Sequence, residues 1–222
     1  MKKRIVLLAV FVAMSSSVVA AEKELEIQGK RLISRMPPFT LNMPAELRLA
    51  HSSTAEYPKE NSRTRAYFFV SEKSGQVEQM VIVQIADRTN PEAELISAPP
   101  LKPDTEKGLY AKGKLTREKV GVDYLIQLIA WIPDSPSLQP IVKKGFRIPS
   151  HLAIQGQFML IYGGENAVFL RYSKDVGSFG MKVSGKGADW NRELISGNEK
   201  KVQEVFQKDF MKMIDSLTFK TP

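Results

Sequence analysis

Few residues in this sequence have the types and spacing that chemistry requires. The run from Gly180 to Gly187 has the glycine and lysine spacing of a phosphate-binding P-loop. In a P-loop a serine or threonine follows the lysine and holds Mg²⁺, whereas Gly187 follows Lys186 here. The mismatch favours a glycine-rich surface loop over a nucleotide site.

The two histidines, His51 and His151, lie a hundred residues apart. A metal site built on both would need carboxylate ligands, and no local spacing indicates any. The sequence also lacks the Gly-x-Ser-x-Gly elbow that carries the nucleophile of many serine hydrolases. We therefore expect no cofactor, no metal and no catalytic residue, and a hydrolase without a recognisable motif is the least favoured alternative.

Three side chains at four-residue spacing, Asp123, Gln127 and Trp131, share one face of an expected strand. A carboxylate, an amide and an indole aligned in this way could bind a small polar ligand such as a sugar or a cell-wall fragment, with Trp131 as the stacking platform. The alternative is the wet face of a sheet whose aromatic end lies under a loop.

Basic side chains gather in places along the chain, which has 32 Lys and Arg residues against 24 Asp and Glu. Lys143, Lys144 and Arg147 stand in a stretch with no acidic residue. Trp190 and Arg192 are of the types that dominate binding hot spots, although Trp190 could equally hold its own glycine-rich loop in place. These five residues could contact an envelope protein or an anionic polymer, and a solvated basic face is the alternative. No base-stacking aromatic motif accompanies the charge, so nucleic acid is not expected as a partner.

The first residues predict export. Lys2, Lys3 and Arg4 precede an apolar run from Ile5 to Met14 that is too short to cross a membrane, and Ala20 and Ala21 offer small side chains for cleavage. We expect residues 1–21 to be a cleavable signal peptide, which would leave a net charge of +8 − 3 = +5 and no membrane span. The expected location is the periplasm or the exterior. The sequence has no cysteine, which excludes a lipid anchor and disulfides.

Residue patterns indicate the elements that would position these side chains. Residues 22–38 read as a lead-in arm, 52–62 as a polar loop and 90–103 as a proline-rich loop, all around a single domain at 39–222. Strands are expected at 39–43, 63–70, 77–86, 120–132, 157–162 and 167–172. Apolar residues from Val202 to Leu217 recur at three- and four-residue spacing after Asn198, a plausible N-cap. The expected fold class is α+β, a twisted, mostly antiparallel sheet packed against a C-terminal amphipathic helix.

The ends of this domain, Phe39 to Pro44 and Phe210 to Phe219, resemble the first strand and the last helix-to-strand segment of the PsbP/Mog1-like family. The resemblance implies a sheet packed with helices and a binding or assembly-helping role without catalysis. Ala45 stands where such proteins often have an aromatic residue. We therefore expect an exported, non-catalytic binding or assembly-assisting protein of the bacterial envelope, with binding of a small polar ligand as the alternative.

Overall fold

The structure, a computed structural model, describes residues 25–97, 100–104, 108–149, 152–182, 195 and 197–219. Within these residues, eleven strands form two antiparallel sheets. The larger sheet contains, in spatial order, β4 (Arg48–Tyr57), β5 (Ser62–Lys73), β6 (Gln76–Arg88), β10 (Asn166–Asp175), β9 (Leu152–Tyr162), β8 (Val120–Ala130) and β7 (Leu109–Arg117). The smaller sheet contains β1 (Leu25–Gln28), β2 (Arg31–Arg35), β3 (Pro38–Asn42) and β11 (Thr218–Phe219). The helices are α2 (Gln139–Val142), α3 (Gly197–Asp215) and the 3₁₀ turns η1 (Pro58–Glu60) and η3 (Val176–Phe179).

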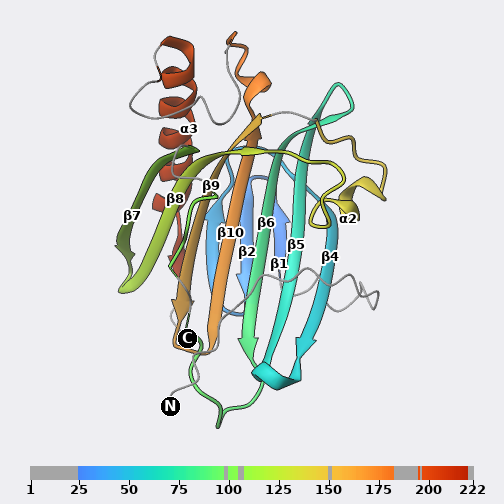
Figure 1. Cartoon of the computed structure of the whole chain (residues 1–222). Helices are drawn as coiled ribbons and strands as arrows, with labels where there is room; N and C mark the ends of the chain where they lie inside the picture. The colour runs from blue at the N-terminus through green and yellow to red at the C-terminus, as the bar shows by residue number, and fades with distance from the viewer. Residues whose placement is uncertain are drawn as a thin grey trace.

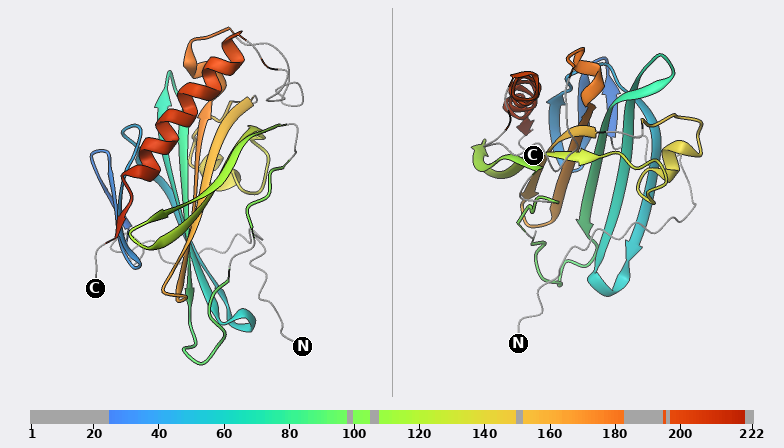
Figure 2. Two further views of the ribbon diagram at one scale, coloured as in Figure 1. Left: turned by 90° about the vertical axis from the view of Figure 1, so that its left-hand side faces the viewer. Right: turned by 45° about the horizontal axis from the view of Figure 1, so that its top comes forward.

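The larger sheet separates two layers of very different size. Its inner face carries both α3 and the smaller sheet, which lie behind it in Figure 1 and to one side of it in Figure 2, left. Of the described residues, its outer face, which Figure 1 shows from the front, carries α2 with its flanking loops and part of the connection from β6 to β7. The inner face therefore holds the main core, and the outer face is covered by fewer elements.

The main core follows from period-two alternation on the long strands. Val81, Val83 and Ile85 of β6 are fully buried on the inner face. Phe206 of α3 stacks on Tyr172 of β10, with 5.1 Å between the ring centroids. This contact places the apolar stripe of the predicted C-terminal helix on the sheet.

A smaller core lies on the outer face. Phe68, Met80 and Ile82 point outward from β5 and β6 and are buried under the segment that follows β8. That segment contributes buried apolar side chains of its own, namely Trp131, Leu138, Ile141 and Ile148. Since a sheet face this apolar cannot stay in contact with water, the α2 segment is its cover.

Two sheets stand where we expected one. The fold is mostly β, with antiparallel sheets and a C-terminal helix, because residues 25–35 of the expected lead-in arm form β1 and β2 instead of an irregular stretch. Leu25 and Leu32 are 2% and 0% exposed in the main core, which explains why this hairpin is fixed. The charged residues between these two leucines face away from the core, and they obscure the apolar pattern in the sequence.

Other boundaries differ for local reasons. Residues 52–57, expected as loop, continue β4, whose serine and threonine side chains suit the half-buried edge of the sheet. Val77 lies in the outer core and Val81 in the main core, because the register shifts by one residue near Glu72. The strand predicted at 120–132 ends at Ala130, and Ile132 is 58% exposed before Pro133. The strands at 39–43, 63–70 and 77–86 are confirmed.

A buried charge network joins the sheet to the β2–β3 turn. The Asp87 carboxylate accepts hydrogen bonds from Arg65 at 2.8 Å and from Asn166 at 2.9 Å. Arg63 adds a more exposed contact at 3.2 Å, and Arg65 also donates to the Met36 carbonyl at 3.1 Å. The network thus ties β5, β6 and β10 to the smaller sheet, mainly through the buried charges of Arg65 and Asp87.

The last strand completes the smaller sheet at the edge opposite β1. β11 pairs with β3, and the hydroxyls of Thr40 and Thr218 are 2.7 Å apart. The Phe219 N–H donates to the Glu118 carboxylate at 2.8 Å, which links β11 to the β7–β8 turn as well. The C-terminal segment thereby touches both sheets.

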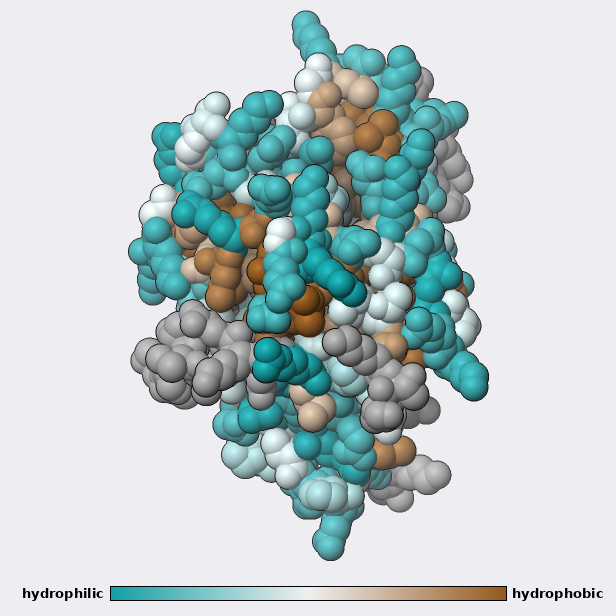
Figure 3. All heavy atoms as spheres, turned by 180° about the vertical axis from the view of Figure 1, so that it is seen from behind, coloured by the Kyte–Doolittle hydropathy of each residue, from teal (hydrophilic) through white to brown (hydrophobic). Residues whose placement is uncertain are grey.

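The surface seen from behind, over the smaller sheet and α3, is mostly hydrophilic, and hydrophobic side chains show in separate areas between charged ones (Figure 3). No helix among the described residues has both the length and the apolar character that a membrane crossing requires.

Candidate functional site

The segment that covers the outer core is anchored at its far end by a short parallel contact with β6. The Val77 N–H donates to the Arg147 carbonyl at 2.8 Å. The Arg147 guanidinium donates in turn to the carbonyls of Gly75 at 3.0 Å and Ser74 at 3.3 Å. Gly75 has a positive φ of 74°, and a Cβ there would come within 2.8 Å of the guanidinium. A glycine in the β5–β6 turn is thus what allows Arg147 to lie against the turn.

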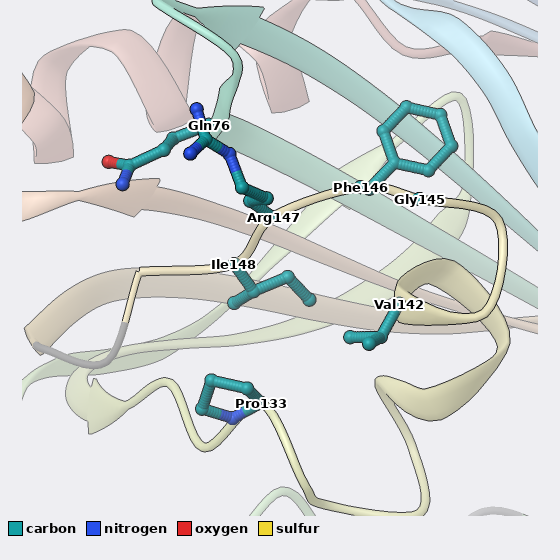
Figure 4. A pocket seen from close by; sticks show the side chains of 7 residues that line it. All are labelled: Gln76, Pro133, Val142, Gly145, Phe146, Arg147 and Ile148. Atoms are coloured by element: carbon teal, nitrogen blue, oxygen red, sulfur yellow. The ribbon is translucent and has the colours of Figure 1, made fainter.

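A pocket of about 500 Å³ opens beside this anchor. It is lined by Gln76, Pro133, Val142, Gly145, Phe146, Arg147 and Ile148. Figure 4 shows Pro133, Val142 and Ile148 converging from three stretches of the segment. The lining is mostly apolar, so the pocket suits an apolar side chain rather than a sugar ring. We call it the α2 pocket.

Cationic side chains flank the α2 pocket. Lys143 and Lys144 are exposed at the end of α2, and no carboxylate of the described residues forms an ion pair with either of them or with Arg147. The Arg48 guanidinium lies 4.9 Å from the centroid of the Phe146 ring and pairs with Glu72. The site therefore combines an apolar hollow with positive charge that the protein leaves uncompensated.

His51 brings a titratable group close to this charge. His51 lies on β4, and the centroid of its ring is 5.6 Å from that of Phe68 on β5. Burial lowers the pKa of His51 from the usual 6.5, and the positive charge of Lys144 lowers it further. His51 is therefore neutral in the folded protein at neutral pH, and this part of the folding free energy is present above pH 6.5 and lost as the pH falls below it.

The Lys144→Gln substitution should raise the pKa of His51, because it removes a positive charge that opposes protonation. We expect the His51 ring signal in a proton NMR titration to have its midpoint below 6.5 in the wild type and to move upward in the variant. The His51→Gln variant assigns the signal against His151. A midpoint that stays in place would mean that Lys144 does not act on His51.

Lys143 and Lys144 follow α2, and Arg147 lies three residues further on, against the β5–β6 turn. Trp190 and Arg192 lie outside the described residues, as does His151. The structure also describes only the first three residues of the glycine-rich run, in which Gly180 ends η3 with a φ of 66°. Among the described residues, no three His, Asp or Glu side chains gather so as to hold a metal ion.

The three residues expected to bind a small polar ligand occupy different surroundings. Trp131 follows the end of β8 and is 3% exposed under the α2 segment. Gln127 is 1% exposed, and its side-chain oxygen accepts a hydrogen bond from the Asp104 N–H at 2.8 Å. Asp123 lies 3.4 Å from Lys114 in an exposed ion pair. The indole thus belongs to the outer core, where it presents no stacking surface to a sugar.

Sequence reasoning missed the apolar half of the α2 pocket. The prediction named only the cations of this segment, although Val142, Phe146 and Ile148 alternate with them. The available signal was this mixture of apolar and basic residues between two prolines, which differs from an ordinary solvated loop. Arg48 could not be found in this way, since it comes from a strand far away in the sequence.

No family model, no curated protein and no solved structure matches the chain.

Proposed function

We propose that this protein is an exported, non-catalytic binding protein of the bacterial envelope and that it holds an acidic, apolar-tipped segment of another envelope protein in the α2 pocket. The observation that carries the proposal is the pair of exposed, unneutralised lysines, Lys143 and Lys144, beside an open apolar pocket of about 500 Å³. Such a surface is complementary to a carboxylate next to an apolar side chain.

Two properties of the pocket favour a protein over an anionic polymer. A polysaccharide or polyphosphate needs cations and polar groups throughout its site, whereas Gln76 and Arg147 are the only lining residues with polar side chains. The Arg147 guanidinium is already engaged by two carbonyls of the β5–β6 turn, so fewer of its donors are left for the anionic groups of a polymer. An apolar pocket with charges at its edge suits an apolar side chain next to a carboxylate.

The remaining parts of the proposal rest on the sequence. Residues 1–21 support export, and the resemblance of the chain ends to the PsbP/Mog1-like family supports an α+β plan and a role without catalysis. Neither depends on the α2 pocket, so each can be tested separately.

The Lys143→Gln/Lys144→Gln variant should weaken binding of the partner about tenfold, since two charges at the rim of an interface are together worth roughly 1.4 kcal/mol. The partner is isolated on immobilised wild-type protein, purified and titrated against each variant. Binding should also weaken as the salt concentration rises.

The matched control is Lys200→Gln/Lys201→Gln, which removes two adjacent exposed lysines from α3 on the other face of the sheet. It should bind as the wild type does. A second variant, Val142→Gln, fills the pocket with a polar side chain and should also lose binding. Equal affinity in the wild type and in both pocket variants would refute the proposal.

A further inference from the structure

An arginine at the middle of the outer face has no partner of the kind that its charge requires. Arg171 lies on β10, the central strand in Figure 1, where it pairs across with Ile82 of β6 and Gln157 of β9. Its guanidinium lies 4.5 Å from the centroid of the Phe169 ring. Within the part of the chain that the structure describes, no side-chain hydrogen bond or ion pair reaches this guanidinium.

The surroundings of Arg171 make its charged form less favourable than in water. Burial lowers the pKa of Arg171 from its usual value, and the negative charge of Asp104 opposes the shift. An arginine keeps its charge in proteins at any ordinary pH. A partly buried cation without an ion pair is unfavourable. No donor of Arg171 is among the buried side-chain atoms of the described residues that lack a partner, so its donors remain open to water or to a ligand.

Arg65, on the same sheet, differs from Arg171 because it forms an ion pair within the protein. It lies on the inner face, where the Asp87 carboxylate accepts its hydrogen bond at 2.8 Å. No such carboxylate bonds Arg171 on the outer face. Asp104 acts on it only through space, and the backbone N–H of Asp104 is fixed by Gln127 at 2.8 Å. The two arginines differ in whether the protein supplies the anion.

Two amides stand next to Arg171 with no side-chain hydrogen bond of their own among the described residues. Gln157 lies directly across on β9, and Gln84 lies diagonally on β6. Cross-strand neighbours on one face are within about 5–8 Å of each other, which is within reach of these long side chains. Ile82 and Met159, 5% and 9% exposed, are apolar neighbours on the same face. One fork of donors and two amides thus face the same space.

We infer that Arg171, Gln84 and Gln157 bind an oxyanion, the phosphate or carboxylate group of a small ligand, on the outer face of the larger sheet. The planar guanidinium matches such a group with two parallel hydrogen bonds, and the Phe169 ring lies against it. The amides supply further donors. This site is separate from the α2 pocket and does not depend on the proposed function.

The test uses the purified protein with inorganic phosphate and succinate as probes, at constant ionic strength. Thermal unfolding and titration calorimetry are followed for the wild type, Arg171→Met and the control Lys112→Met, which removes an exposed charge from the same face on β7. Saturating probe should raise the Tm of the wild type and of the control by about 2–4 °C and leave Arg171→Met unchanged. A response to phosphate alone, or to succinate alone, assigns the ligand group.

Without ligand, Arg171→Met should melt about 2–4 °C above the wild type, because a methionine of similar length removes a charge that the fold does not use. A lower Tm would show that the guanidinium serves stability and would overturn the inference. So would no response of the wild type to either probe, or equal losses in Arg171→Met and Lys112→Met. Gln157→Leu provides an independent variant, which should weaken the response severalfold.

Discussion

The Asp87→Asn variant should lose about 3–5 kcal/mol of its free energy of unfolding, the usual cost of breaking one side of a buried ion pair. Arg65 is 2% exposed, and the substitution leaves its guanidinium without this carboxylate. Asn166 and Arg63 lose the same acceptor charge. Urea unfolding followed by circular dichroism measures the loss.

Asp123→Asn is the matched control for Asp87. It removes a carboxylate from the same sheet, but its partner Lys114 is 84% exposed and the two groups are 3.4 Å apart. Such surface pairs contribute only about 0–1 kcal/mol. If both variants lost the same small amount, the network around Asp87 would not be a principal source of stability.

The Gly156→Ala variant should lose about 1–3 kcal/mol, although alanine suits a strand better than glycine. Gly156 lies on β9 beneath α3, and a Cβ there would come within 2.5 Å of the Phe210 ring. The missing side chain is therefore the space that lets the helix approach the sheet. Gly121→Ala on β8, where a Cβ would meet nothing within 4 Å, should be neutral or slightly stabilising.

A double-mutant cycle identifies the cause of that loss. Phe210→Ala alone should cost about 3–5 kcal/mol through the cavity it leaves. Adding Gly156→Ala to it should cost nothing or restore some stability, because the clash has gone. Additive losses would show that Gly156 is required for a reason other than its contact with Phe210.

The C-terminal helix and the central hairpins could be predicted because their apolar residues repeat on one face. Val202, Phe206 and Phe210 follow a helical period, and Val81 and Val83 follow a strand period. In each case the pattern reports burial against a single core, which is what sequence periodicity can detect.

The smaller sheet escaped prediction because its contribution to the core is thin. β1 buries only Leu25, and β2 buries Leu32 and the polar Ser34. A period cannot be read from one buried apolar side chain per strand. Residues 52–57 of β4 were predicted as a loop for a related reason. This edge strand gains its stability from backbone hydrogen bonds to β5, and such bonds leave no pattern in the side-chain types.

The candidate sites could be predicted only in part, because they join distant segments. Lys143, Lys144 and Arg147 are neighbours in sequence, so their cluster was visible. Arg171 reads as an ordinary outward-facing residue of a strand until the sheet shows that no carboxylate stands beside it. What the sequence lacks is the register of β10 against β6 and β9.

The pairing of β11 with β3 also sets the order in which the molecule can assemble. Thr40 and Thr218 lie 178 positions apart, so the smaller sheet cannot close until the whole chain is present. Contacts between such distant segments are slow to form, because a large loop must be closed before they contribute. Until then β3 keeps one unpaired edge, to which a strand of another molecule could add. A chain shortened before Thr218 should therefore associate with itself, because the two residues of β11 cover the edge of β3 in the intact protein.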